Sequence, residues 1–159
     1  LTMSAVRPKP DATESGRMLG QVTPLLHVRL VTSDGIAYDG PSTAVTAPGV
    51  GGNVTVLLHH APMLSMLEPG ELVIQSTDGN IVFAIGGGCL DVIDDVVTII
   101  AESAERPEEI DLAQAEADVQ QAEKLAKRYR SRPEATQAAL QRAKVRLRVA
   151  RRAQRPGGT

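Results

Sequence analysis

The chain divides into two parts of different composition, and this break limits its fold more than any other feature of the sequence. Residues 21–103 hold short runs rich in Val, Ile, Leu and Thr between Gly, Pro and Asp, whereas the residues after Asp111 are rich in Ala and Arg. Strands spaced this closely, with no helical pattern between them, favour an antiparallel arrangement over a parallel α/β sheet. The sequence therefore predicts an α+β chain: an N-terminal antiparallel β-sandwich or flattened barrel followed by a C-terminal antiparallel αα-hairpin.

We expect five segments along the 159 residues. Residues 1–20 contain Pro, Asp and Ser and lack the apolar core of a secretory signal, so we expect a disordered leader there. The β-sandwich is expected over 21–105, a linker over 106–110, the two-helix hairpin over 111–153 and a disordered tail over 154–159. No run of about 18 apolar residues is present, which argues against a membrane span.

The β-part shows the two-residue period of half-buried strands. Leu26, Val28 and Leu30 alternate with His27 and Arg29, and Asp34-Gly35 then supplies a turn. Further strands are expected at 36–39, 43–47, 53–57, 71–76, 81–85, 89–93 and 96–101. Asp78-Gly79-Asn80 and Asp94-Asp95 are expected to form turns between strands.

The C-terminal part shows helical spacing. Asp111 is a predicted N-cap that accepts a hydrogen bond from the amide near Gln114, and Pro133 starts a second helix. One narrow apolar seam is expected on each helix: Leu112, Ala115, Val119, Ala122, Leu125 or Ala126, and Tyr129 on the first, and Ala135, Ala139, Ala143, Leu147 and Ala150 on the second. Because alanine contributes only about 0.8 kcal/mol per buried carbon, the sequence predicts a weakly held, movable hairpin.

Charge is unevenly distributed although the net charge is only −2. Of the 17 Lys and Arg residues, 12 lie between Lys124 and Arg155, where only Glu134 opposes them. Residues 102–123 are instead acidic, and Arg106 is the single cationic residue among them. This pattern predicts an anionic partner for the last helix.

The residue types that carry catalysis or metal binding form no convincing group. His59-His60 is the best metal candidate, but neighbouring residues of a strand point to opposite faces, so no metal site is expected. Gly86-Gly87-Gly88 lacks the Lys-Ser/Thr ending of a phosphate loop and predicts a close approach or bulge between strands. Cys89, the only cysteine, is expected to be a small buried apolar residue. We therefore expect no enzymatic activity.

Several short motifs follow one another in a definite order. They are Val31-Thr32-Ser33-Asp34-Gly35, Ala47-Pro48-Gly49-Val50-Gly51-Gly52, His60-Ala61-Pro62-Met63-Leu64, Gly86-Gly87-Gly88-Cys89-Leu90-Asp91-Val92, Val96-Val97-Thr98-Ile99-Ile100-Ala101-Glu102, Ala104-Glu105-Arg106 and Ile110-Asp111. In this order and spacing they resemble the epsilon subunit of the F-type ATP synthase, which is called delta in mitochondria. The resemblance covers about residues 25–152.

The resemblance implies a non-catalytic rotor subunit that couples the gamma stalk to the c-ring. It places the subunit at the cytoplasmic face of the bacterial plasma membrane, as a peripheral protein associated with the membrane only through the complex. The implied contacts with the c-ring and gamma are Asn53, His59, His60 and Met63, although Asn53 stands where relatives carry an acidic residue.

The same resemblance implies that the C-terminal helices extend toward the alpha and beta subunits and inhibit ATP hydrolysis. The residues of this inhibitory arm are Arg142, Lys144, Arg146, Arg148, Arg151 and Arg152. No cofactor is required, but ATP is an implied regulatory ligand, with nucleotide contacts at Asp111, Arg142 and Arg146. Gln114 replaces the arginine of the family's nucleotide motif and cannot offer a guanidinium to phosphate.

Two other classes of function are compatible with parts of the pattern. A nucleic-acid-binding adaptor could use the basic last helix, but aromatic residues make up only 2% of the chain, too few for a base-stacking platform. We therefore expect no nucleic-acid partner. A small enzyme built on the β-part would need converging polar groups, and the sequence offers none.

Overall fold

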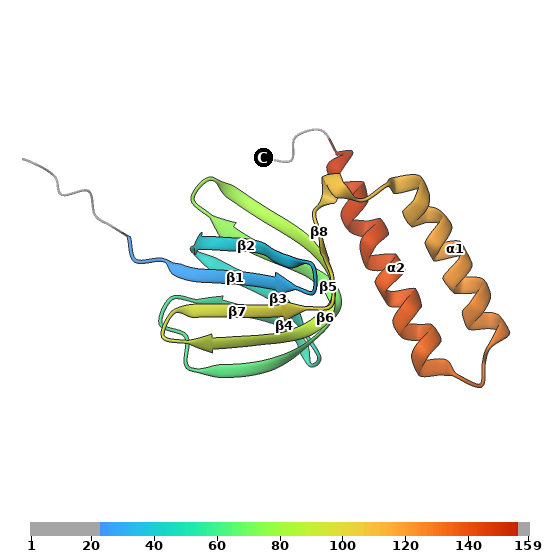
Figure 1. The fold of residues 1–159 in the computed structure, drawn as a ribbon, viewed down its shortest axis with the longest axis horizontal. Helices are drawn as coiled ribbons and strands as arrows, with labels where there is room; N and C mark the ends of the chain where they lie inside the picture. Colours follow the sequence, from blue (N-terminus) through green and yellow to red (C-terminus); the bar gives the residue numbers. More distant parts are fainter. Residues whose placement is uncertain (1–22, 156–159) are drawn as a thin grey trace, which may run out of the picture.

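The computed structural model describes residues 23–155, so the predicted leader and most of the predicted tail lie outside the described residues. Eight strands are followed by a 3₁₀ turn and two helices (Figure 1). The strands are β1 Leu26–Thr32, β2 Gly35–Ser42, β3 Ala44–Gly49, β4 Gly52–Leu57, β5 Met63–Ser76, β6 Gly79–Ile93, β7 Val96–Ala101 and β8 Ala104–Glu105. The 3₁₀ turn is Pro107–Glu109, and the helices are α1 Leu112–Arg128 and α2 Pro133–Ala153.

The strands form one hydrogen-bonded path, β2-β1-β7-β6-β5-β3-β4, with β8 paired to β6. All neighbours are antiparallel except β1 and β7, which run parallel. The sheet folds over on itself to enclose one aliphatic core, to which Leu26, Val28 and Leu30 contribute from β1 as their alternation predicts. The β-sandwich of the sequence prediction is confirmed, with one parallel pair added.

Strand β6 is longer than the sequence predicted. The two strands expected at 81–85 and 89–93 are one continuous strand, and the strand expected at 71–76 begins at Met63. The three glycines that suggested a break lie inside β6, where Gly87 and Gly88 have positive φ and a Cβ on Gly88 would overlap the Ile100 carbonyl of β7. The close approach expected of these glycines is confirmed, but it occurs within one strand.

The helical hairpin begins as the sequence predicts. The Asp111 side chain accepts a hydrogen bond of 2.8 Å from the Gln114 amide, and Pro133 occupies the first turn of α2. Helix α2 lies between the β-sandwich and α1 (Figure 1). The hairpin is therefore packed against the sandwich along its second helix.

Packing of α2 differs from the predicted single seam. Ala143 and Ala150 are buried, but Ala135 and Ala139 are exposed because the far end of the hairpin has no third layer beside it. Of the alternatives Leu125 or Ala126 on α1, Ala126 is half-buried and Leu125 is exposed, and Tyr129, also expected in the seam, is exposed. A second face of α2 is buried instead, in a cluster of Ala84, Ile110, Ala115, Val145, Val149 and Ala150.

Candidate functional site

Arg146 joins three elements at the centre of the interface between the hairpin and the sandwich. Its Nε and Nη2 donate to the two carboxylate oxygens of Glu105 in β8, at 2.6 and 3.1 Å. Its Nη1 donates to Asp118 of α1 at 2.8 Å. A bidentate guanidinium–carboxylate pair fixes both distance and orientation, so this side chain ties α2 to its neighbours on both sides.

The surroundings of Arg146 keep it charged. Its hydrogen bond with Glu105 raises the pKa of Arg146 above its ordinary value, partial burial opposes this, and the charges of Glu105 and Asp118 add to the increase. All three guanidinium nitrogens have carboxylate partners. Arg146 thus has little capacity left for another anion while the hairpin is docked.

Two further ion pairs cover the exposed sides of α2. Arg142 contacts Glu102 at 3.0 Å, next to β7, and Arg151 contacts Glu116 of α1 at 3.5 Å. All four side chains are substantially exposed, so each pair contributes only about 0.2–1 kcal/mol to docking.

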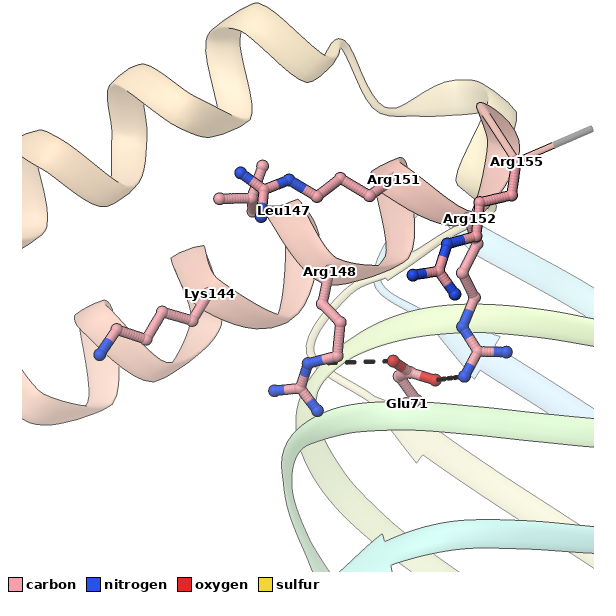
Figure 2. Close-up of a pocket in the computed structure, with 7 residues that line it drawn as sticks. All are labelled: Glu71, Lys144, Leu147, Arg148, Arg151, Arg152 and Arg155. Atoms are coloured by element: carbon pink, nitrogen blue, oxygen red, sulfur yellow. Dashed lines mark ion pairs between the residues drawn. The ribbon is translucent and has the colours of Figure 1, made fainter.

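Glu71 of β5 pairs with two arginines one helical turn apart. Its carboxylate lies 2.7 Å from Arg152 and 4.0 Å from Arg148, and its side chain is only 14% exposed (Figure 2). Around this carboxylate is a groove of about 820 Å³ lined otherwise by α2 and the residues just after it: Lys144, Leu147, Arg148, Arg151, Arg152 and Arg155. The basic face of α2 is therefore partly neutralised by the β-sandwich itself.

The structure brings together only two of the three predicted nucleotide contacts. Arg142 and Arg146 line one groove between α1 and α2. The Asp111 side chain caps α1 instead, and the Gln114 side chain donates to Asp118 at 2.8 Å. Glu102 pairs with Arg142, and Glu105 and Asp118 pair with Arg146. The guanidinium groups that a phosphate would need therefore already have carboxylate partners.

The predicted rotor contacts on the β-sandwich fall into two places. Asn53 is the second residue of β4, opposite Pro48, whereas His59 and His60 follow the end of β4 and Met63 begins β5. Four residues of strand, 54–57, follow Asn53 and span about 13 Å at 3.3 Å per residue before the turn that holds His59. The structure therefore groups His59, His60 and Met63 and leaves Asn53 at the other end of the strand.

The premise that placed His59 and His60 on a strand is wrong, because both lie in the connection between β4 and β5. His59 has φ of 62°, a left-handed conformation, and its amide donates to Asp95 at 2.6 Å. The His59 ring also lies 3.3 Å from Asp95. Within residues 23–155 no group of three or more metal-ligating side chains converges, and neither helix is long and apolar enough to span a membrane.

One feature of the sandwich was not predicted from the sequence. A row of paired residues crosses five strands on the outer face of the sheet: Met66, Cys89, Ile100, Val31 and Ile36. Met66, Ile100 and Ile36 are 62%, 55% and 61% exposed. We call these five residues the apolar row. Cys89, expected to be buried, is half-exposed within it.

Exposed apolar side chains aligned across neighbouring strands are typical of a surface that binds another protein. The sequence signal that could have revealed the apolar row is the two-residue period of the strands, which puts these residues on the outward face. The period does not tell which outward face remains uncovered, because that depends on where the hairpin packs.

Comparison with known proteins gives a consistent result. Residues 25–107 match the family model described as ATP synthase, Delta/Epsilon chain, beta-sandwich domain. The ATP synthase epsilon chain of Herpetosiphon aurantiacus is 38% identical over 128 residues, which cover 79% of this chain and 94% of that protein. The ATP synthase epsilon chain of Lacticaseibacillus casei is 33% identical over 135 residues, covering 83% and 93%.

Among solved structures, a chain of the mitochondrial ATP synthase of Euglena gracilis is similar in fold. The TM-score is 0.67 with 24% identity, over 86% of this chain and 85% of that one. The similarity extends past the sandwich, since the matched share of this chain is larger than the region covered by the family model.

Proposed function

The chain belongs to the delta/epsilon-chain family of the F-type ATP synthase, whose members are non-catalytic stalk subunits, and on this basis we propose how the β-sandwich and the hairpin of this chain work. The β-sandwich attaches to the gamma stalk and contacts the c-ring, at the cytoplasmic face of a bacterial plasma membrane. The hairpin leaves the sandwich to reach the alpha and beta subunits.

The apolar row is the observation that supports attachment through the sandwich. It offers a row of uncharged side chains across five strands, and its exposed Met66, Ile100 and Ile36 would be buried by a partner. Burying apolar surface contributes about 25 cal/mol per Å², so such a face suits a permanent contact with gamma. The group of His59, His60 and Met63 at one end of the sandwich is proposed for the c-ring side.

A charge placed in the apolar row tests this attachment. Met66→Asp and Ile100→Asp should each reduce the amount of gamma that co-purifies with the chain, because a carboxylate would be desolvated at the contact. Leu57→Asp is the matched control, since Leu57 is also exposed on a strand but lies outside the row. Normal recovery of gamma with both row variants would contradict the assignment.

The hairpin supports the inhibitory part of the proposal. Its cationic residues Arg142, Arg148, Arg151 and Arg152 are mostly exposed and are held by carboxylates of the same chain. An acidic segment of the alpha or beta subunit offers the same chemistry, so the arm can exchange one set of carboxylates for another. Attraction between clustered charges in a cleft would hold the arm, and salt would strongly weaken this attraction.

Deletion of residues 108–159 separates the two roles. The truncated chain should still assemble with gamma through its sandwich, and ATP hydrolysis by the assembled complex should rise. Assembly with unchanged hydrolysis would contradict the inhibitory arm while leaving the attachment intact. Loss of assembly would show instead that the hairpin is needed for attachment.

ATP as a regulatory ligand of Asp111, Arg142 and Arg146 is the remaining part of the proposal. Its phosphates would have to replace Glu102 and Glu105 as partners of the two arginines. Equilibrium dialysis of the free chain with ATP measures this directly. Absence of binding at millimolar ATP would exclude a sensor role for this site.

A further inference from the structure

The groove around Glu71 has a strong excess of positive charge. Five cationic side chains, Lys144, Arg148, Arg151, Arg152 and Arg155, line it together with one carboxylate, which leaves a formal charge of +4. Arg151 and Arg152 also lie in the last turn of α2, where cations offset the helix dipole. That dipole is equivalent to only about half a charge, and Glu116 of α1 lies 3.5 Å from Arg151, so more than half of the excess remains.

Glu71 lies 2.7 Å from Arg152 and 4.0 Å from Arg148, and it does not use up the donors of either arginine. A guanidinium carries five N–H groups, and one carboxylate oxygen faces each of Arg148 and Arg152. Their side chains remain 58% and 53% exposed, and Figure 2 shows both extending from α2 to the same carboxylate. Holding a cationic side chain in place before binding reduces the conformational entropy that it loses when a ligand binds. This arrangement contrasts with Arg146, whose three nitrogens are all committed to carboxylates.

The spacing of the cations sets the size of a matching anion. Arg148 and Arg152 are one helical turn apart and both reach the Glu71 carboxylate, Arg151 lies in the last turn of α2, and Arg155 follows the end of the helix at Ala153. One phosphoryl group can match Arg148 and Arg152, as one carboxylate does, but two or three linked groups are needed to reach Arg151 and Arg155 along the groove as well. Arginine binds phosphate oxygens through two parallel N–H groups.

We propose that the groove between α2 and Glu71 binds an anion with at least two phosphoryl groups. The ligand is either a soluble oligophosphate or the phosphate headgroups of anionic lipids. This site lies apart from Asp111, Arg142 and Arg146, and it goes beyond the proposed rotor function. It can be tested on the free full-length chain, independently of the assembled complex.

Calorimetric titration of the full-length chain with inorganic tripolyphosphate should show saturable one-to-one binding. The double variant Arg148→Gln/Arg152→Gln should bind at least tenfold more weakly. Arg151→Gln/Arg155→Gln should do the same while leaving both contacts of Glu71 with α2 in place and removing only the exposed Arg151–Glu116 pair between the two helices, which limits any effect of undocking. Lys124→Gln/Arg128→Gln removes the same charge from α1, outside the groove, and should change the affinity less than twofold.

Sedimentation with vesicles distinguishes the two sources of phosphate. Binding to vesicles that contain phosphatidic acid, but not to pure phosphatidylcholine, and its loss in Arg148→Gln/Arg152→Gln would assign the site to lipid headgroups. Tripolyphosphate binding without vesicle binding would assign it to a soluble anion. The proposal is overturned if neither probe binds, or if the control variant weakens binding as much as the groove variants.

Discussion

At the scale of single residues, Gly88 is the position least able to change. Its φ of 146° disfavours any side chain, and a Cβ there would overlap the backbone of β7. Gly88→Ala combines backbone strain with a steric clash, so we expect the free energy of unfolding to fall by about 2–5 kcal/mol. Urea unfolding followed by circular dichroism measures the loss.

Gly51→Ala provides the comparison for this substitution. A Cβ added at Gly51 would meet no heavy atom within 4 Å, and the φ of Gly51 is not in the left-handed range. The change in unfolding free energy should be within about 0.5 kcal/mol. Equal effects at the two glycines would show that the contact between β6 and β7 is looser than the structure indicates.

Arg146 is the residue on which docking of the hairpin depends most. Arg146→Gln leaves Glu105 and Asp118 without their main partner, so docking should weaken by about 1–3 kcal/mol. Hydrogen exchange should then become faster in α1 and α2 while the sandwich strands stay protected. Arg128→Gln, at the exposed end of α1, should leave exchange unchanged, and faster exchange throughout the sandwich would contradict a local role.

At the scale of elements, α2 is a helix with two buried faces. Val145, Val149 and Ala150 belong to the buried cluster that contains Ala84 of β6, whereas Ala143 is buried outside this cluster. The double variant Val145→Ala/Val149→Ala removes four buried carbons and should weaken docking by about 2–4 kcal/mol. Limited proteolysis of the 106–110 linker should become faster, whereas the exposed substitution Leu125→Ala should have little effect. Unchanged cleavage would mean that the ion pairs alone hold the hairpin.

The sequence predicted elements better than their contacts. The alternation of β1, the Asp94-Asp95 turn and the Asp111 cap follow from local chemistry and are confirmed. Continuity of β6 through three glycines could not be predicted, because those glycines are required by a neighbouring strand that local patterns do not reveal.

The same limit applies to α2 and to its ionic partners. Valines placed among arginines conceal a second apolar stripe, so the repeating alanines dominated the prediction of the seam. Glu71 and Arg152 are 81 positions apart in the sequence, and only the packed fold shows that they pair at 2.7 Å. The charge pattern predicted an anionic partner for α2, but it did not indicate that the sandwich supplies part of that negative charge.

At the scale of the whole molecule, docking and the proposed inhibition would use the same cations. The docked hairpin holds Arg142, Arg146 and Arg152 against Glu102, Glu105 and Glu71. The proposed inhibitory state would present the same face of α2 to acidic segments of other subunits. On this proposal the carboxylates of the β-part act as internal competitors, and the strength of their ion pairs sets the fraction of chains whose arm is free.

The triple variant Glu71→Gln/Glu102→Gln/Glu105→Gln tests this competition. Removing the three carboxylates should cost on the order of 2 kcal/mol of docking free energy, which shifts the equilibrium toward the free arm by roughly thirtyfold. ATP hydrolysis by the assembled complex should fall, because more arms reach their inhibitory position. A triple variant with the same change in charge, Asp78→Asn/Glu123→Gln/Glu134→Gln, removes carboxylates that form none of the ion pairs between α2 and the sandwich and should leave hydrolysis unchanged. Faster hydrolysis in the first variant would mean that these carboxylates help to hold the arm in its inhibitory position, the opposite of internal competition.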